Sequence, residues 1–293
     1  MKLNKIFSEF LLECSSNCKK STIDRYLYVY NKYIFQYFDS YEIENISVND
    51  INFWKLELNK TKLSFESKKK LYFTFSSIFN FAYRVYGINN IFHRCKCFRK
   101  SKPDKEQEFY SLEEFKKYES VISNIEHKLF FNMLFYLGLR RGEALALCWG
   151  DINKNDLEIN KSKRKGVIST PKTIYSFRII KIPSNIMILL KAYLISKKNV
   201  PKKTDPIFNL SETGISRYNS IYAKKANLKK IRIHDFRHSN ITFLCSLGIP
   251  FPSIAKNVGH KNIKEIIEVY LHSDKNYSTE ILNILEKEIN IKN

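Results

Sequence analysis

Glycine and proline are scarce in this chain, and this scarcity constrains the fold more than any other feature. The 293 residues include only 8 Gly and 7 Pro, the residue types that most often interrupt regular structure. Apolar side chains also recur at intervals of three and four, for example at Leu71, Phe75, Ile78 and Phe81. That spacing gives an α-helix one apolar face. The sequence therefore predicts a mainly helical fold.

The chain is long enough for two hydrophobic cores. In its first third the pattern predicts a helix that starts at Ser21 and carries an apolar stripe, followed by helices over residues 48–58 and 66–85. The stripe consists of Leu27, Tyr30, Ile34 and Tyr37. Aromatic residues at this spacing favour a core over base stacking.

The helical pattern stops between residues 94 and 105, a segment that holds six Lys and Arg residues against the single acid Asp104. We interpret it as a basic linker, which could be a solvated loop or could lie along phosphates. The predicted domains are therefore residues 1–104 and 105–293.

The second domain opens with Ser111 and Glu114, the spacing of a helix capping box. An almost wholly apolar helix is expected over residues 125–137. Residues 157–159, 166–168 and 176–180 have the pattern of short strands between polar turns. Helical patterns return from Ser184 onward. The fold class is thus mainly α with a small antiparallel β-sheet.

Charge and cysteine content indicate the partner and the compartment. The 50 Lys and Arg residues against 29 Asp and Glu residues give a net charge of +21, which favours a nucleic acid partner. No stretch approaches about 18 consecutive apolar residues and no segment resembles a signal peptide, so a cytoplasmic protein without a membrane partner is expected. The six cysteines lack zinc-site spacing, and we expect reduced thiols without a metal.

Three short motifs and a tyrosine carry groups suited to phosphodiester transfer. They are Gly138-Leu-Arg-Arg-Gly-Glu143, His234-Asp-Phe-Arg-His238, Val258-Gly-His260, and Tyr270, ten residues after the last histidine. Transfer of a phosphoryl group to a side chain needs a nucleophile, cations for the non-bridging oxygens, a base and an acid. An acid three residues after an arginine, as in the first motif, can orient the guanidinium.

In order and spacing these motifs resemble those of the tyrosine recombinases, also called phage-type integrases, whose pattern is G-L-R-x-x-E, H-x-L-R-H and L-G-H before the tyrosine. The resemblance covers the whole chain and is tightest over residues 132–152 and 231–272. The N-terminal helices are similar to the family's core-type DNA-binding domain. Leu137, Phe236 and Val258 depart from the family pattern, but each is a packing change.

The resemblance implies a helical core-binding domain followed by an α+β catalytic domain with a C-terminal helix. It also implies roles for six residues: Arg140 and Arg237 hold the scissile phosphate, His234 and His260 hydrogen-bond it or move protons, Lys172 protonates the leaving oxygen, and Tyr270 attacks. Lys161, Lys163 and Lys165 are expected on the same sheet and are alternatives for the acid. Asp235 and His238 could equally be structural.

The implied activity is site-specific DNA recombination through a 3′-phosphotyrosine intermediate, with integration or excision of a mobile element as the expected role. The arginines and imidazoles supply the charge that a metal would otherwise provide, and the cleaved bond's energy stays in the phosphotyrosine, so no cofactor, divalent metal or ATP is expected. The expected partner is double-stranded DNA, bound as a homotetramer on two recombination sites.

Three alternatives remain open at this level: a chromosome-dimer resolvase of the same family, a catalytically silent DNA-binding regulator, and a relaxing topoisomerase. A terminal helix starting near Ser278 could dock on a neighbouring protomer or fold back on its own domain.

Overall fold

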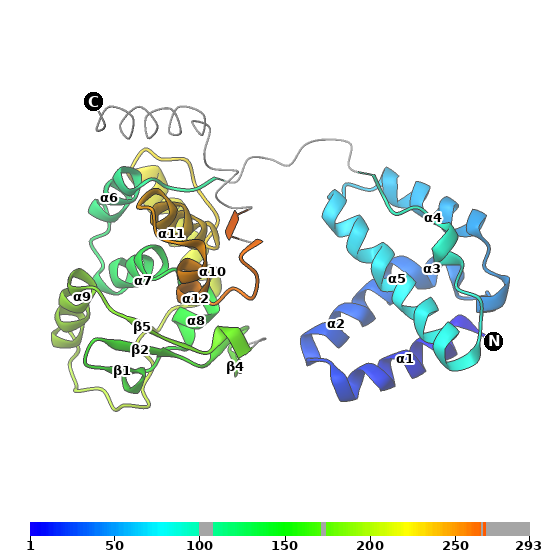
Figure 1. The fold of residues 1–293 in the computed structure, drawn as a ribbon, viewed down its shortest axis with the longest axis horizontal. Coiled ribbons are helices and arrows are strands. Elements are labelled where there is room, and N and C mark those ends of the chain that lie inside the picture. The colour runs from blue at the N-terminus through cyan, green and yellow to red at the C-terminus, as the bar shows by residue number, and fades with distance from the viewer. Residues whose placement is uncertain (100–107, 171–173, 265, 268–293) are drawn as a thin grey trace, which may run out of the picture. The chain divides into compact units, whose positions relative to one another are not determined.

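The computed structural model describes residues 1–99, 108–170, 174–264 and 266–267. The chain divides into two compact units, Met1–Asp104 and Lys105–Asn293, and each unit has its own hydrophobic core (Figure 1). Helices dominate both units, and the strands are short and antiparallel. The predicted fold class is confirmed.

The first unit, as described over residues 1–99, is built from helices and turns, with one isolated antiparallel bridge between Lys2 and Glu42. In chain order its elements are α1 (Leu3–Asn17), α2 (Lys20–Val29), the π-helical turn η1 (Tyr30–Ile34), α3 (Phe35–Phe38), the 3-10 turn η2 (Ile43–Asn45), α4 (Val48–Lys60), α5 (Phe65–Tyr86) and the 3-10 turn η3 (Ile91–Arg94). The long helix α5 packs against α1 and α2 and also contacts η3 (Figure 1). It ends where Gly87 takes a φ of 69°, a left-handed conformation that glycine adopts without steric cost.

Aromatic side chains form much of this first core, as their spacing predicted. Phe75 is fully buried and meets Phe38, Trp54 and Phe92 at ring centroid distances of 5.0, 5.3 and 5.3 Å. Cys95 and Cys97 pack against the edge of the same core. The rings of this core therefore act by packing.

The predicted helices 48–58 and 66–85 are confirmed with ends shifted by one or two residues. The helix α1 was not predicted. The helix expected from Ser21 starts at Lys20 and is interrupted by the π-helical turn η1, so the predicted stripe is wrong at Leu27, which is 38% exposed. A π-helical turn contains one extra residue, which rotates the preceding side chains away from the face formed afterwards.

In its described residues the second unit combines helices with five short strands. Its elements are α6 (Leu112–Ser120), α7 (Ile125–Tyr136), α8 (Arg141–Ala146), η4 (Trp149–Asp151), β1 (Ile152–Asn153), β2 (Asp156–Ile159), β3 (Ser162–Arg164), β4 (Val167–Ser169), η5 (Ile174–Ser176), β5 (Arg178–Lys181), α9 (Ser184–Ile195), α10 (Glu212–Lys225), α11 (Asp235–Ser246) and α12 (Phe251–Val258). The predicted capping box at α6 is confirmed, since the Glu114 N–H donates to Ser111 Oγ at 3.2 Å and the Ser111 N–H to Glu114 Oε2 at 2.8 Å.

The strands form two sheets where one was predicted. The order of the first is β1-β2-β5, and the second is the β3–β4 hairpin. The pairing of β2 with β5 ends at Ile159 opposite Arg178, so β3, which follows, pairs with β4 alone. The residues predicted to start the last strand include Ser176, which lies in η5 instead.

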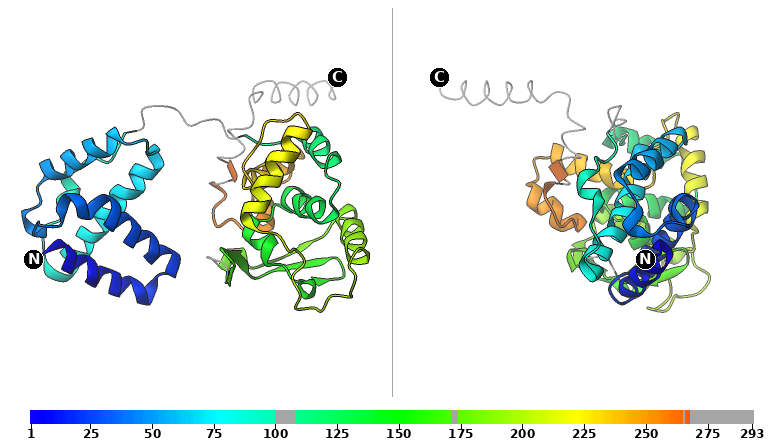
Figure 2. Two further views of the ribbon diagram at one scale, coloured as in Figure 1. Left: turned by 180° about the vertical axis from the view of Figure 1, so that it is seen from behind. Right: turned by 90° about the vertical axis from the view of Figure 1, so that its right-hand side faces the viewer.

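Helix α7 passes through the middle of this unit and is buried along most of its length. It contacts α6, α8, α9 and α11, and the left view of Figure 2 shows the sheets at one end of the unit. One region of the unit is therefore surrounded by the ends of α7 and α12 and by the beginnings of α8 and α11. None of the helices in the described ranges is long and apolar enough to cross a membrane.

Candidate active site

A glycine positions the first candidate arginine. Gly138 follows α7 with a φ of 62°, and a Cβ at this position would lie 2.5 Å from Asn240 Oδ1 and 2.9 Å from Val258 Cγ1. Only glycine satisfies both the backbone angle and this close approach. The turn brings Arg140 into the extended conformation that precedes α8.

Arg140 is held by an acid one turn into α8. Its backbone N–H donates to Glu143 Oε2 at 2.9 Å, and its Nη1 donates to Glu143 Oε1 at 2.8 Å. These two hydrogen bonds orient Arg140, as the spacing of the two residues predicted. Arg140 Nη2 also donates to the carbonyl of Gly259 at 3.0 Å. The side chain of Glu143 is 3% exposed and that of Arg140 is 35% exposed, so the cation lies at the surface end of the pair.

The second motif lies at the start of α11. His234 is the residue that precedes this helix, and Arg237 lies within its first turn. Arg237 Nη1 donates to the carbonyl of Gly138 at 2.7 Å, which ties α11 to the turn that carries Arg140. Arg237 is only 1% exposed, so in this structure its guanidinium lies beneath the surface of the site.

The third motif ends α12. Gly259 has a φ of 73° and terminates the helix, and the His260 N–H donates to the carbonyl of Ala255 at 2.9 Å. Because Arg140 bonds the carbonyl of Gly259, the first motif is joined directly to the residue before His260. Three segments far apart in sequence therefore converge through backbone contacts.

The two imidazoles share an electropositive environment. Burial is the main cause that lowers the pKa of His234 to about 4, and nearby His238 and Arg237 lower it further. The pKa of His260 falls to about 3, through burial first and then the charges of Arg237 and Arg140. Both rings are therefore neutral near pH 7, and each can accept a proton.

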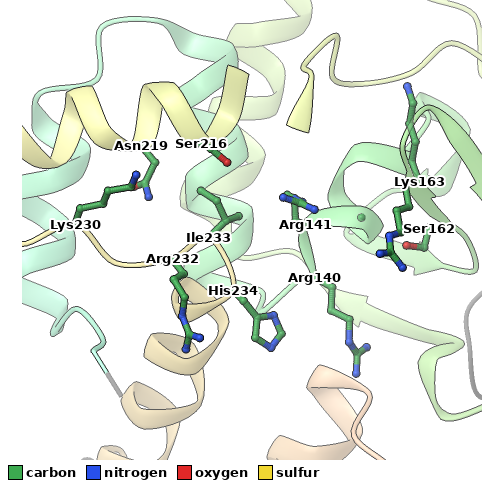
Figure 3. Close-up of a pocket in the computed structure, with 12 residues that line it drawn as sticks. Arg140, Arg141, Ser162, Lys163, Ser216, Asn219, Lys230, Arg232, Ile233 and His234 are labelled. Carbon is green, nitrogen blue, oxygen red and sulfur yellow. The ribbon is translucent and has the colours of Figure 1, made fainter. Parts of the chain in front are cut away.

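A basic pocket of about 550 Å³ opens beside these groups (Figure 3). Arg140 and His234 lie next to each other on its wall, and Lys163 lines it from strand β3. Its basic lining residues are Arg140, Arg141, Lys163, Arg164, Lys230 and Arg232. Such a concentration of cations on a concave surface suits a phosphate backbone. His260 lines a neighbouring pocket of about 680 Å³, between η5, β5 and α12.

Two candidate residues, Lys172 and Tyr270, lie outside the described residues, as does the expected C-terminal helix. Among the alternative lysines, Lys161 Nζ is paired with the carboxylate of Asp151 at 2.7 Å, whereas Lys163 lines the basic pocket. Within the described ranges, no cluster of three His, Cys, Asp or Glu side chains could hold a metal ion.

Comparisons with known proteins decide the family. A model described as the phage integrase family matches residues 105–277, and one described as the phage integrase N-terminal SAM-like domain matches residues 2–58. The chain belongs to the phage integrase family. It is therefore a tyrosine recombinase, a DNA strand-transferring enzyme with a SAM-like N-terminal domain.

Individual phage integrase relatives agree with this assignment. The chain is 31% identical over 304 residues to the ICEBs1 integrase of Bacillus subtilis (strain 168), a match that covers 96% of this chain and 82% of the relative. Its fold is similar to that of the Tn1549 transposon integrase in complex with transposon right end DNA, with a TM-score of 0.79 at 17% identity over 98% of this chain and 100% of that one. It is also similar to a lambda integrase in a tetramer bound to a Holliday junction, with a TM-score of 0.67 at 18% identity over 90% and 79% of the two chains.

Sequence reasoning missed one residue that bears on this integrase site. Arg178 on β5 also bonds Glu143, with Nη2 to Oε2 at 2.9 Å and Nη1 to Oε1 at 3.3 Å. A signal for it existed in the strand pattern, because Arg178 and the buried Ile180 are two residues apart and so share one face of the strand. A charged residue on the inward face of a strand needs a buried partner.

The residues left out of the candidate set have structural contacts. Asp235 is buried and accepts hydrogen bonds from the backbone N–H of Arg232 at 2.8 Å and from its Nε at 2.9 Å. This pair fixes the turn before α11. His238 packs its ring edge-on to His234 with centroids 4.8 Å apart. Both residues therefore support the position of His234.

Proposed function

We propose that this chain is a site-specific integrase of a mobile element, which cleaves and rejoins DNA strands through a 3′-phosphotyrosine on Tyr270. The observation that carries the proposal is the convergence of Arg140, His234 and Arg237 beside a basic pocket, with His260 joined to Arg140 through the carbonyl of Gly259.

The proposed chemistry uses the geometry of this site. The Tyr270 hydroxyl oxygen forms a bond to phosphorus while the bond from phosphorus to the 5′ oxygen breaks. A tyrosine hydroxyl has a pKa near 10, so its proton must leave as the bond forms, and neutral His260 can accept it. Lys172 would donate a proton to the departing 5′ oxygen, which leaves as a hydroxyl.

The positive side chains stabilise the charge on the phosphoryl oxygens. Arg140 faces the pocket and can donate directly to a non-bridging oxygen, as His234 can. Arg237 is buried in this structure, so its charge acts across a short distance, and direct contact with a phosphate would require the site to open on DNA. The attack of a free 5′ hydroxyl on the phosphotyrosine reverses these steps.

We further propose that residues 1–104 form a DNA-binding domain and residues 105–293 the catalytic domain. A groove in the first unit supports this, since Arg25, Lys69 and Lys70 line it together with Tyr26 and Phe73. Cations beside the exposed ring of Phe73 suit a nucleic acid. The assembly on DNA would be a homotetramer on two sites, as for the lambda integrase bound to a Holliday junction.

The match to the ICEBs1 integrase spans nearly the whole chain, which favours mobile-element integration or excision over chromosome-dimer resolution. A catalytically silent regulator would not need the four groups that converge at the site, which are Arg140, His234, Arg237 and His260.

The test is to trap the covalent intermediate. The wild-type protein should become joined to the 3′ phosphate of a nicked suicide substrate, and peptide mapping should place the DNA on Tyr270. Tyr270→Phe should bind the same DNA and form no adduct, because it lacks only the hydroxyl. Tyr277→Phe is the matched control and should react like the wild type. An adduct mapped to Tyr277, or one that persists in Tyr270→Phe, would contradict the assignment.

A further inference from the structure

Arg178 is buried on β5 beneath the candidate active site. Its side chain is 5% exposed, and all three guanidinium nitrogens donate hydrogen bonds. Nε donates to the carbonyl of Asn257 at 2.7 Å, Nη1 to the carbonyl of Ser176 at 3.2 Å, and Nη1 and Nη2 to the two carboxylate oxygens of Glu143 at 3.3 and 2.9 Å. This fork geometry holds the carboxylate rigidly.

The second arginine changes the charge balance of the site. A buried Arg140–Glu143 pair alone would be neutral, and the carboxylate would cancel the cation that faces the pocket. With Arg178 the three groups carry a net charge of +1. Arg140 is the exposed member at 35%, and Arg178 and Glu143 are 5% and 3% exposed. The surplus positive charge is therefore available at the end where a phosphate can approach.

Charges in this cluster also act on Glu143 itself. Burial alone would raise its pKa, but the hydrogen bond and charge of Arg178, together with Arg140, hold the pKa at about 2. The carboxylate is therefore ionised near neutral pH.

Arg178 also fixes the backbone that leads to His260. It bonds the carbonyl of Asn257, while Arg140 bonds the carbonyl of Gly259. A Cβ on Gly259 would lie 2.9 Å from Arg178 Nη1 and 3.0 Å from the carbonyl oxygen of Tyr175. The end of α12 is therefore packed directly onto this guanidinium.

We propose that Arg178 is a positioning residue for strand transfer, which neutralises Glu143 so that Arg140 keeps its charge for the scissile phosphate, and which fixes the chain before His260. This inference rests on the proposed function. It differs from a role in stability alone, because its effect should depend on the charge of the substrate phosphate.

The experiment compares adduct formation on two suicide substrates at saturating DNA. One has an ordinary scissile phosphate, and in the other a methylphosphonate removes the negative charge of that phosphate. Arg178→Met should slow the reaction roughly 100-fold on the ordinary substrate, the scale of losing one preorganised donor, with DNA affinity changed less than about threefold. The loss relative to wild type should be at least about tenfold smaller on the methylphosphonate, which needs the charge of Arg140 less.

Two further variants separate charge from packing. Glu143→Gln combined with Arg178→Met removes both buried charges and frees Arg140 from neutralisation, so it should react about tenfold faster than Arg178→Met on the ordinary substrate. Arg178→Lys keeps the charge but loses the fork, and should fall between wild type and Arg178→Met. If Arg178→Met does not fold, the double variant and Arg178→Lys carry the test, since the charge of Arg140 survives in both and each should then react within about tenfold of wild type.

The matched control on the same strand is Lys181→Met, which removes a cation paired with Asp156 that the described contacts do not connect to Arg140. It should leave the ratio of rates on the two substrates unchanged. Equal losses of Arg178→Met on both substrates, or no recovery in the double variant, would show a structural role only and overturn the inference. If the wild-type protein forms no adduct on either substrate, the proposed function fails, and the inference fails with it.

Discussion

The imidazoles of His234 and His260 are kept neutral by their surroundings. Burial and the charges of Arg237 and Arg140 lower the pKa of His234 to about 4 and that of His260 to about 3. A neutral ring can take the proton of an attacking hydroxyl, which an imidazolium could not. The charges of Arg140 and Arg237 thus favour the neutral form of both rings.

This depression of the pKa predicts how stability depends on pH. An unfolded chain takes up a proton on each histidine near pH 6.5, whereas the folded protein does so only near the depressed pKa. Stability should therefore fall as the pH drops from about 6.5 towards 4. For His234 the loss between pH 7 and pH 5 should be about 2 kcal/mol. Urea unfolding of the DNA-free protein at the two pH values measures it.

The comparison variant is His234→Gln, which cannot titrate. Lost packing can change its stability at pH 7, but its loss of stability between pH 7 and pH 5 should be smaller than that of wild type. An identical pH dependence in the two proteins would show that folding does not lower the pKa of His234. Buried His127, whose pKa burial also lowers, contributes equally to both proteins.

At the scale of elements, the site depends on how closely α8 approaches the β3–β4 hairpin. Gly142 lies in the first turn of α8, and a Cβ there would lie 2.5 Å from Ser162 Oγ and 2.9 Å from the carbonyl oxygen of Lys163. The serine side chain could rotate away, but the strand carbonyl could not. Glu212 also holds this hairpin, since it accepts from the Lys165 N–H at 2.6 Å and from Arg141 Nη2 at 2.6 Å.

Gly142→Ala should therefore push β3 away from α8 and displace Lys163 from the pocket. We expect a loss of about 1–3 kcal/mol in the free energy of unfolding, as for other overpacked sites, and a slower rate of adduct formation. Gly166→Ala is the control in the turn of the same hairpin, because its φ of 80° strains an alanine but no atom lies within 4 Å. Gly166→Ala should lower the free energy of unfolding, but it should slow adduct formation less than Gly142→Ala does. If the two variants form the adduct at equal rates, the close contact between α8 and β3 does not affect the site.

At the scale of the whole molecule, the positive charge is distributed over both units. The net charge is +21. Basic side chains line the groove of the first unit, including Arg25, Lys69 and Lys70, and the pocket beside Arg140 in the second. A protein that neutralises many phosphates releases many counterions, so its affinity falls steeply with salt.

We therefore expect the affinity of Tyr270→Phe for its DNA to fall by about 1,000-fold or more between 50 and 200 mM salt, as for a protein with about six phosphate contacts or more. Replacing both Lys69 and Lys70 by Ala should reduce the magnitude of the log–log slope by about two. The control replaces Lys191 and Lys198, which lie on and just after α9 and line none of the pockets described above. A slope near zero, or equal slopes in the two double variants, would contradict a DNA contact by the first unit.

The sequence by itself determined the helical content, the family motifs and those caps whose partners lie one turn apart. Ser111 with Glu114 and Arg140 with Glu143 are such pairs, and both are formed as predicted. The reason is physical, since neighbours on one turn of a helix meet whatever the rest of the chain does. The π-helical turn at residues 30–34, which the spacing did not predict, marks the limit of that local rule.

Only the tertiary structure decided which distant groups meet. Arg178 and Glu143 are 35 residues apart, and Arg140 lies 119 residues before the carbonyl of Gly259 that it bonds. No spacing rule relates such positions, because they are brought together by the packing of α8, β5 and α12 against one another. The burial of the Arg237 side chain also depends on that packing. The sequence indicated the candidate groups, and the packing of the folded chain decided the burial and the partners of those that the structure describes.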